Sequence, residues 1–465
     1  MSIALAERNL DDIAALGIPV PQYDRRALSP KILHIGVGGF HRAHMALYTD
    51  EVAGSGGDWG ISGVGLLDGD RQMADALGGQ DLLYTLVERD NDGASVRVVG
   101  SIVDYAFVAG NEPEFVRRVV DPEVAILSMT ISEGGYSLAG GNPTIETIVS
   151  GLDARHAAGG RPLTILSCDN LPNNGAVVRD AIATVAAARS AELLRYVERS
   201  CTFPTSMVDR ITPQTRYEDV RWLRDEFGIE DAWPVVCESF RQWVIKDDFI
   251  AGRPAWENAG ALFTDRVHDW ELYKLRMLNA SHSSMAYLAA LAGVEFVDEA
   301  MAIQAIRQYL ERFLSTEAIP TLTEIPGHPA REYAETVFRR LENKNVRDQI
   351  ARLCIDGASK FPSFLIPTVE AQLERGGPVA CAALALAGWA RYLATVPAAE
   401  RAPDVHGDEA AAAAARGPEA FLELDLVFTA RLRDSERFRE AFVAASRELS
   451  ERGPLATMEA LTPVA

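Results

Sequence analysis

Residues 31–44 read Lys31-Ile-Leu-His-Ile-Gly-Val-Gly-Gly-Phe-His-Arg-Ala-His44. A short apolar run that leads through a glycine cluster into a helical pattern is typical of the first strand, turn and helix of a dinucleotide-binding domain. In such a turn Gly36 permits the sharp bend, and Gly38 lets the backbone approach a pyrophosphate at the helix N-terminus. The match to the GxGxxG pattern is incomplete because His41 occupies the third glycine position, so the turn alone is a weak signal.

A second apolar stretch, residues 59–67, predicts the next strand and ends in Asp68-Gly-Asp70. An acidic residue at this strand end can accept hydrogen bonds from both ribose hydroxyls and would repel a 2′-phosphate, which favours NAD over NADP. Asp68 lies farther from Gly38 than the usual distance of about twenty residues, and simple turn chemistry is the alternative for both aspartates. We expect the cofactor to be bound by Gly36, Gly38, Gly39, Phe40, Asp68 and Asp70.

Further strand-like runs follow at residues 84–87, 96–99, 124–130 and 162–168. The last run leads into Asp169-Asn170 and then into a helical pattern from about Ala176. Ligands of doubly wound sheets gather beyond the carboxyl ends of the strands, where Asn170 would lie, although turns also favour Asn for their own sake. From residue 266 onward Ala, Leu and Arg dominate and strand alternation is scarce. The sequence therefore predicts an α/β fold, with a Rossmann-type doubly wound domain at residues 1–265 and a mainly α-helical domain at residues 266–465.

The stretch Glu271-Leu-Tyr-Lys-Leu-Arg-Met-Leu-Asn-Ala-Ser-His282 reads as a helix, because leucines recur in it at helical spacing. In a regular α-helix Lys274, Glu271, His282 and Asn279 would lie at about 0°, 60°, 80° and 140° around the axis. One broad face would then carry a base, an amide and an imidazole, unless it is an ordinary exposed charged face. Lysine is scarce beside arginine in this chain, which suggests a need at Lys274 for a cation that can lose its proton.

Composition excludes several other classes of protein. The net charge of −21 disfavours nucleic acid as the main partner, because phosphate binding needs a broad positive surface. The five cysteines show no CxxC spacing, which fits reduced, mostly buried thiols in the cytoplasm and gives no sign of a structural zinc. No signal peptide is apparent, and the longest apolar run, residues 381–396, is short for a bilayer and contains Arg391, so we expect no membrane partner.

Four segments together carry a resemblance to a known family: residues 34–44, residues 167–175 with Asn170, Val208-Asp-Arg-Ile-Thr-Pro213, and the spacing Lys274-x4-Asn279-x2-His282. They resemble the polyol-specific long-chain dehydrogenase/reductase family. The resemblance implies metal-independent, NAD(P)-dependent oxidation of a secondary alcohol of a polyol to a ketose, or the reverse. Mannitol and fructose are the expected pair, with arabinitol, sorbitol or a hexuronate (fructuronate reduction) as alternatives, and the site would lie between the two domains.

The resemblance also implies roles at matching positions: Lys274 as general base, Asn170 and Asn279 as ligands of the reacting oxygen, His282 orienting substrate, Glu271 in proton passage, and Asp209, Arg352 and Lys360 in the substrate pocket. The chemistry agrees, because a lysine removes a hydroxyl proton near neutral pH only if its pKa falls well below about 10.4. Burial or a nearby cation such as Arg352 would lower that pKa.

Three other classes of protein fit these motifs less well. A zinc-dependent polyol dehydrogenase needs Cys, His or Glu ligands, yet no cysteine lies near His41 and His44 in the sequence. A short-chain dehydrogenase would carry a Tyr-x-x-x-Lys pair, and no lysine here has a tyrosine four residues before it. A non-catalytic NAD-binding protein would have lost the base or an oxygen ligand. We expect a monomer, with a small homo-oligomer as the alternative.

Overall fold

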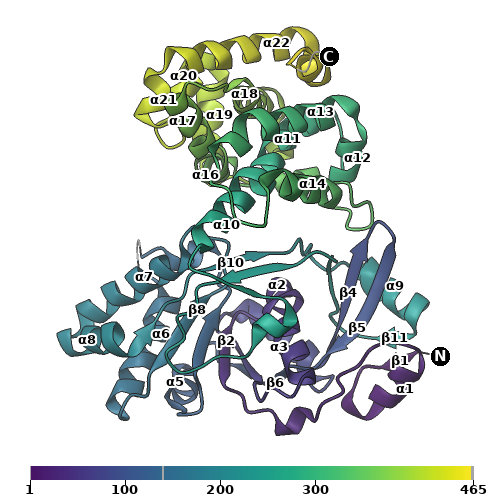
Figure 1. Cartoon of the computed structure of the whole chain (residues 1–465), viewed down its shortest axis with the longest axis vertical. Helices are drawn as coiled ribbons and strands as arrows, with labels where there is room; N and C mark the ends of the chain where they lie inside the picture. The colour runs from purple at the N-terminus through teal and green to yellow at the C-terminus, as the bar shows by residue number, and fades with distance from the viewer. Residues whose placement is uncertain (1, 139–140, 462–465) are drawn as a thin grey trace. The chain divides into compact units, whose positions relative to one another are not determined.

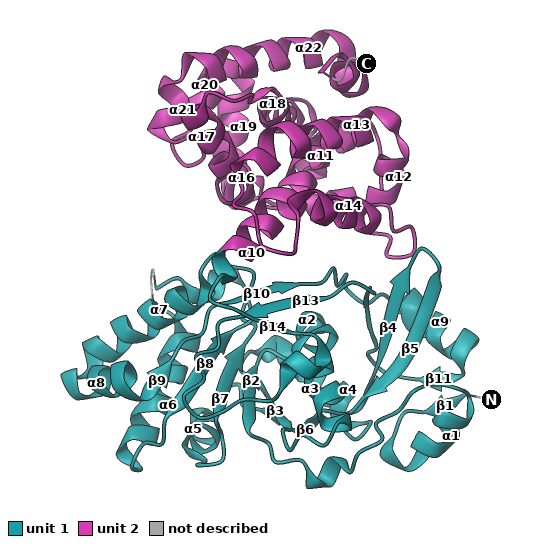
Figure 2. Cartoon of the chain, in the orientation of Figure 1, with its two compact units in different colours: residues 1–268 teal, residues 269–465 magenta. Residues whose placement is uncertain are grey.

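The computed structural model describes residues 2–138 and 141–461, and the chain divides into two compact units, residues 1–268 and 269–465 (Figure 2). The division falls within α10 (Val267–Tyr273), close to the boundary expected after residue 265. Within the described ranges no helix is both long enough and apolar enough to cross a membrane. All five cysteines are unpaired and buried, as their spacing predicts.

Unit 1 is built on a six-stranded parallel sheet (Figure 1). Its strands lie in the order β6 (Ile102–Phe107), β3 (Ile61–Gly65), β2 (Ile32–Ile35), β7 (Ile126–Met129), β8 (Leu163–Ser167) and β9 (Cys201–Thr202). This is the order 3-2-1-4-5-6 of a Rossmann-type fold, with the topological switch point between β2 and β7. The prediction of a doubly wound domain is confirmed.

Helices cover both faces of this sheet, as a parallel sheet requires. One face packs against α3 (Met45–Gly54) and α4 (Arg71–Gly78), with Leu47 and Leu77 in the shared core. The other face packs against α5 (Glu112–Val120), α6 (Pro143–Ala157), α7 (Asn174–Arg189) and α8 (Ala191–Ser200). The four central strands β3, β2, β7 and β8 are buried along their whole length, as expected for a sheet covered on both faces, whereas the edge strand β6 is mostly half-buried.

Two strand-like runs of the sequence leave the main sheet. β4 (Tyr84–Asp90) and β5 (Gly93–Val99) form an antiparallel hairpin, and β12 (Val235–Glu238) pairs parallel to β4. β4 and β5 pair antiparallel because the connection between them is short, whereas a parallel crossover needs a dozen or so residues. Asp90 closes the turn by accepting hydrogen bonds from the backbone N–H groups of Asp92 and Gly93.

The remaining elements of unit 1 are small. A third sheet holds β10 (Ser206–Asp209), β13 (Gln242–Ile245) and β14 (Leu262–Phe263), and β1 (Ile3–Ala4) pairs with β11 (Ile229–Glu230). The helices α1 (Leu10–Ala15) and α9 (Tyr217–Phe227) lie in the same unit, and a separate apolar core there includes Ile13 and Leu223.

The described part of unit 2, residues 269–461, contains helices and isolated bridges but no strand, which confirms a mainly α-helical second domain. Its α-helices after α10 are α11 (Ala280–Leu291), α12 (Val297–Ala302), α13 (Gln304–Arg312), α14 (Ala330–Leu341), α15 (Ile350–Leu353), α16 (Gly357–Phe364), α17 (Ile366–Arg375), α18 (Ala380–Thr395), α19 (Gly407–Ala415), α20 (Pro418–Leu422), α21 (Ala430–Asp434) and α22 (Glu436–Leu461). The long apolar run of the sequence is α18, which is buried and packs against α11 and α22.

The N-terminus of α18 is capped by a buried carboxyl group. Glu317, on the π-helical segment η7 (Phe313–Ala318), accepts hydrogen bonds from the backbone N–H groups of Cys381 (2.6 Å) and Ala382 (3.0 Å). Burial raises the pKa of Glu317 to about 7, although these two hydrogen bonds and the charge of Arg312 act in the opposite direction. The native state therefore holds a proton on Glu317 that the unfolded chain releases at lower pH.

Replacing this carboxyl group should change how stability depends on pH. Because the folded-state pKa is raised, the contribution of Glu317 to stability is largest at low pH and is lost as the pH rises toward 7. Relative to the wild type, Glu317→Gln should therefore gain about 2 kcal/mol in unfolding free energy between roughly pH 5.5 and 8. Urea titrations at both pH values measure this difference. Glu335→Gln, at an exposed position of α14, is the control, and a pH-independent difference for Glu317→Gln would contradict the assignment.

Candidate active site

The glycine turn lies at the switch point of the main sheet. Gly36 has φ +88°, and a Cβ there would stand 2.2 Å from the carbonyl oxygen of Thr130, so only glycine fits. The Thr130 hydroxyl donates to the Gly36 carbonyl at 2.6 Å, which fixes the turn against the end of β7. By contrast, a Cβ on Gly38 would find no neighbour closer than 4.0 Å. The packing of the described residues therefore leaves room for a side chain at Gly38, and the open space suits a closely approaching phosphate group.

His41, which replaces the third glycine, is part of the packing under this turn. Its ring stacks on His34 with centroids 3.5 Å apart, and His34 Nδ1 lies 2.9 Å from the Ser128 hydroxyl. Burial holds the pKa of His41 well below its ordinary value, so a neutral ring stacks there. The expected helix is also interrupted: α2 (Gly39–Ala43) ends at His44, whose φ and ψ are −124° and −97°, and α3 starts at the next residue.

The two aspartates after β3 have different surroundings. Asp70 Oδ2 accepts from the backbone N–H of Leu67 at 2.9 Å and closes the 3₁₀ turn η3 (Asp68–Asp70), which is the turn chemistry that was the alternative reading. The Asp68 side chain is exposed and has no hydrogen-bond or ion-pair partner within residues 2–138 and 141–461. Of the two, Asp68 is the one available to a ribose.

Asn170 lies in the turn that follows β8, and neighbouring polar side chains brace that turn. The Asp169 carboxylate accepts from the backbone N–H groups of Ile131 and Ser132, both at 2.9 Å, and so ties together the loops after β7 and β8. The Asn174 amide donates to the carbonyl oxygens of Ser167 (3.1 Å), Asp169 (3.1 Å) and Ser206 (2.8 Å). Sequence reasoning missed both bracing residues, although the run Asp169-Asn170-Leu-Pro-Asn-Asn174 shows an excess of turn-forming side chains.

Asp209 is the last residue of β10 and is buried. It lies opposite Gln242 in the antiparallel pair of β10 and β13, so the pairing fixes its backbone position. The carbonyl of Gln242 in turn lies 3.0 Å from Nε2 of His44, at the start of α3. This contact holds β13, the strand paired with the one that carries Asp209, against the start of α3.

In unit 2 the helix that carries Lys274 departs from the regular α-helix expected from its spacing. Residues Lys274–Asn279 form a π-helical segment, η6, between α10 and α11. The backbone N–H of Ala280 donates to the carbonyl of Leu275, five residues earlier, instead of four. Such a segment absorbs one extra residue into the helix, and π segments of this kind are frequent at functional sites.

The extra residue changes which side chains share a face. With one residue absorbed, Lys274, Asn279 and His282 lie at about 0°, 40° and −20° around the axis, with Glu271 still at about 60°. The wide angular spread predicted from a regular α-helix is therefore wrong: the three side chains lie closer together around the axis. Lys274 and Glu271 are both buried, so the ordinary exposed charged face is not what the structure contains.

His282 is held as a neutral imidazole in this part of the chain. Burial lowers its pKa to about 4; the carboxylate of Asp348 opposes this change, and the cations Arg352 and Lys360 act with it. Nε2 of His282 is buried and has no hydrogen-bond partner among the residues that the structure describes. Depending on the tautomer, a neutral ring nitrogen in this position can donate a hydrogen bond to a bound hydroxyl group or accept one from it.

The two expected pocket cations are already engaged within unit 2. Arg352 makes a bidentate ion pair with Asp348, with Nε donating to Oδ1 at 2.6 Å and Nη2 donating to Oδ2. Burial alone would raise the pKa of Asp348, but the guanidinium holds it below its usual value. Lys360 Nζ donates to the backbone carbonyls of Arg352 (3.4 Å) and Leu353 (3.2 Å). The spacing Asp348-x3-Arg352 is the sequence signal that would have shown the pair.

No group of three or more His, Cys, Asp or Glu side chains positioned to hold a metal ion occurs in residues 2–138 and 141–461. The geometry that does occur is a Rossmann-type sheet with an open glycine turn, and a helix face that gathers a lysine, an amide and a neutral imidazole. These features define the class of two-domain dehydrogenases that act on alcohols.

Comparison with known proteins agrees with that class. Residues 30–258 match the model of the mannitol dehydrogenase Rossmann domain, and residues 266–450 match that of the mannitol dehydrogenase C-terminal domain. The chain belongs to the mannitol dehydrogenase family. Mannitol 2-dehydrogenase of Phaeosphaeria nodorum is 38% identical over 98% of this chain and 85% of its own length, and that of Aspergillus fumigatus is 36% identical over 98% of both chains.

Solved structures show the same relationship. The Pseudomonas fluorescens mannitol 2-dehydrogenase, in a ternary complex with NAD and D-mannitol, has a TM-score of 0.90 and 37% identity, covering 99% of both chains. A D-sorbitol dehydrogenase in substrate-free form has a TM-score of 0.88 and 33% identity, covering 98% of this chain and 100% of its own. The chain is thus a polyol oxidoreductase by family.

Proposed function

We propose that this protein is an NAD-dependent, metal-independent dehydrogenase that interconverts D-mannitol and fructose. The observation that carries the proposal is the alignment of Lys274, Asn279 and His282 on one helix face by the π-helical segment. The relative from Pseudomonas fluorescens, whose structure contains NAD and D-mannitol, supports the choice of cofactor and substrate. A glycine turn with open space at Gly38, and an exposed acidic side chain at Asp68, fit the pyrophosphate and ribose of NAD.

Lys274 would act as the general base that takes the proton of the reacting hydroxyl. Its burial keeps it out of bulk water, where an ammonium group would hold its proton more firmly. NAD, when bound, supplies the acceptor for the hydride of the carbinol carbon. Glu271, buried one turn before Lys274 on the same face, would pass the proton onward.

Two amides would stabilise the oxygen as negative charge develops on it. Asn279, one turn from Lys274 in the π-helical segment, would donate one hydrogen bond, and Asn170 at the carboxyl end of β8 would donate another. One donor of this kind is worth about 3 kcal/mol of transition-state stabilisation, which removes the need for a metal ion. His282, through its buried Nε2, would hold a neighbouring hydroxyl of the polyol.

An uncharged polyol fits unit 2 better than a hexuronate. A carboxylate ligand binds best to a cation whose charge is not already balanced. Arg352 already forms a bidentate pair with the Asp348 carboxylate, and Lys360 already donates to backbone carbonyls. Asp209 at the end of β10 would accept hydrogen bonds from hydroxyl groups and would repel a carboxylate. Sorbitol and arabinitol remain as alternative substrates, since they differ from mannitol in stereochemistry or length and not in charge.

The proposal is tested by following NADH absorbance with NAD and a panel of mannitol, sorbitol, arabinitol and a hexuronate. Mannitol should give the highest kcat/KM, and dialysis against a chelator should leave the rate unchanged. Lys274→Ala should lower kcat by about 10²–10⁴-fold, because the general base is lost. Its NADH binding, measured by fluorescence, should match the wild type, because the glycine turn and Asp68 are untouched.

Several results would count against the proposal. No turnover of any polyol or ketose would remove the enzymatic function, and preference for another polyol would correct the substrate. Loss of activity in the chelator would show a required metal ion. Full activity of Lys274→Ala would show that another group is the base.

The preference for NAD should depend on Asp68 and not on Asp70. Asp68→Ala removes the exposed carboxylate that would repel a 2′-phosphate, so the ratio of kcat/KM with NADP to that with NAD should rise. Asp70→Ala is the matched control: it removes the cap on the Leu67 N–H and should lower thermal stability while leaving that ratio unchanged. If instead Asp70→Ala shifts the ratio and Asp68→Ala does not, the ribose contact is at Asp70.

A further inference from the structure

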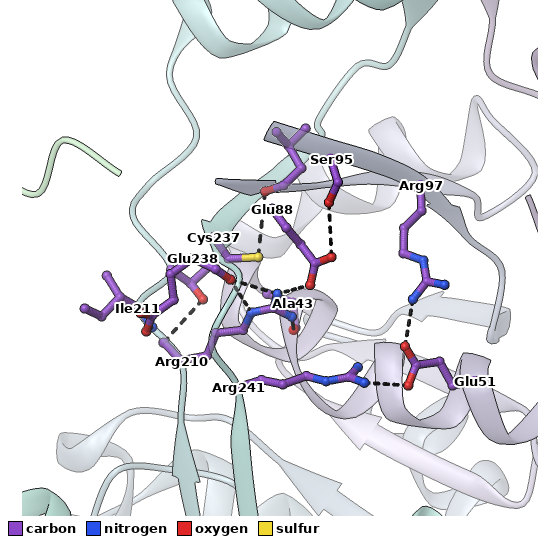
Figure 3. Close-up of polar contacts among 12 residues, drawn as sticks. Ala43, Glu51, Glu88, Ser95, Arg97, Arg210, Ile211, Cys237, Glu238 and Arg241 are labelled. Carbon is purple, nitrogen blue, oxygen red and sulfur yellow. Dashed lines mark hydrogen bonds and ion pairs between the residues drawn. The ribbon is translucent and has the colours of Figure 1, made fainter. Parts of the chain in front are cut away.

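Arg210, the residue that follows Asp209, is buried, and its guanidinium group donates to acceptors on several different elements (Figure 3). Its Nε and Nη2 donate to the carbonyl oxygen of Glu238 at 3.0 and 2.8 Å. Its Nη1 donates to the carbonyl oxygen of Ala43 at 2.6 Å, and Nη2 also donates to the carboxylate of Glu88. One guanidinium group thus contacts three acceptors on three separate elements.

Two of those three elements lie at or beside the expected cofactor site: α2 carries Gly39 and Phe40, and Val235 of β12 lies 3.8 Å from the position that a Cβ on Gly39 would take. Ala43 is the last residue of α2, the helix that follows the glycine turn. Glu238 is the last residue of β12, and Glu88 lies on β4. Arg210 therefore joins the sheet of β12, β4 and β5 to α2 and to β10, the strand that it follows. A planar guanidinium carries five N–H donors on three nitrogens, so it can make all four of these hydrogen bonds; the single ammonium nitrogen of a lysine at this position has three donors and cannot.

Two more contacts extend this connection. The backbone N–H of Ile211 donates to Glu238 Oε1 at 2.6 Å, and the N–H of Glu238 donates to the Ile211 carbonyl at 3.0 Å. The methyl group of Thr212 lies 3.7 Å from the position that a Cβ on Gly39 would take. The segment that starts at Asp209 is therefore packed directly on the glycine turn.

We propose that Arg210 is a positioning residue that holds Asp209 and the glycine turn in a fixed relation within unit 1. Its action on polyol binding rests on the proposed function, in which Asp209 contacts substrate. Loosening Arg210 lets Asp209 and α2 move independently, so the cofactor and the polyol both bind more weakly. The groups that would act directly on the reacting oxygen are untouched, so the effect falls on NADH affinity and on KM more than on kcat.

A neighbouring, half-buried arginine, Arg241, contacts a different set of elements. Arg241 donates to Glu51 Oε2 at 2.6 Å, and Arg97 donates to the other oxygen of the same carboxylate at 2.7 Å (Figure 3). The Arg241 guanidinium also lies over the Tyr48 ring, 4.6 Å from its centroid. Tyr48 and Glu51 lie on α3, and Arg241 also donates to the carbonyl oxygen of Ala259 at 3.3 Å; none of these three partners is on α2 or the segment that follows Asp209.

A matched control lies at the other edge of the sheet. Arg155 is buried as Arg210 is, and it donates to backbone carbonyls that include those of Val119 (2.6 Å) and Val124 (2.9 Å). These carbonyls precede β7, at the amino ends of the strands and away from the glycine turn. Arg155→Lys therefore removes a comparable set of hydrogen bonds without touching the proposed connection.

The experiment compares Arg210→Lys with Arg155→Lys in the full-length protein. We expect both to lower the melting temperature, because each leaves buried carbonyls without donors. Only Arg210→Lys should raise the NADH dissociation constant and the mannitol KM, each by about tenfold, with a smaller change in kcat. Fluorescence titration gives the NADH affinity, and initial rates give KM and kcat.

Glu88→Gln keeps the proposal testable if Arg210→Lys does not fold. It weakens the ion pair between Nη2 of Arg210 and the Glu88 carboxylate, which also accepts a long hydrogen bond from Ser95, and leaves the other bonds of Arg210 in place. It should therefore shift NADH affinity and KM in the same direction by a smaller factor. Wild-type values in a folded Arg210→Lys or in Glu88→Gln would overturn the proposal, as would equal shifts in Arg155→Lys. Absence of polyol turnover in the wild type would refute the proposed function instead, and the NADH titrations would still test Arg210.

Discussion

The candidate site depends on one surplus residue between Lys274 and Asn279. In a regular α-helix the residue beside Asn279 and His282 would be Leu275, and Lys274 would point about 100° away. The π-helical segment η6 absorbs the surplus, so that by helical geometry Lys274 lies nearer to Asn279 and His282 than Leu275 does. A π segment is rare because its hydrogen bonds are poorer, and it persists here where it packs against α11, α14 and α16. The packing of unit 2 thus maintains an alignment that the helix alone would not adopt.

In unit 1 the candidate site residues are also held in place by the surrounding structure. There, short polar side chains form hydrogen bonds that connect the ends of the parallel strands. Thr130 fixes the glycine turn, Asp169 joins the loops after β7 and β8, and Asn174 secures the turn that holds Asn170. Arg210 adds the connection from Asp209 to α2. Because rigid placement of donors and acceptors is what makes them effective in catalysis, these bonds matter for function as well as for stability.

The sequence predicted the fold well, because buried strands and buried helices appear in it as long apolar runs. The apolar runs of residues 124–130 and 162–168 became β7 and β8, and the long apolar run at 381–396 became the buried helix α18. The sequence predicted β4 and β5 as strands but not that they form a separate sheet, because the hydrophobic pattern of a strand does not show which strand it pairs with. The break of the helix at His44 and the stack of His34 on His41 depend on tertiary packing, which local spacing does not encode.

The site was predicted less completely, for physical reasons that differ from residue to residue. Residue spacing assumes a regular period, so it could not place Lys274 beside Asn279 in a π-helical segment. The two aspartates after β3 look alike in sequence, and only the hydrogen bond from Leu67 shows that Asp70 caps a turn. Whether Arg352 is available as a cation depended on Asp348, one helical turn earlier, which the motif did not include.

The most direct test of the π register exchanges two adjacent residues. The double variant Lys274→Leu/Leu275→Lys moves the amine to the position that a regular α-helix would place beside Asn279 and His282. Its kcat for mannitol oxidation should be compared with that of Lys274→Leu alone, with NADH binding as the check on folding. If the π-helical segment positions the base, the double variant binds NADH and is as inactive as the single variant. Recovery of activity toward the wild-type value in the double variant would contradict this account.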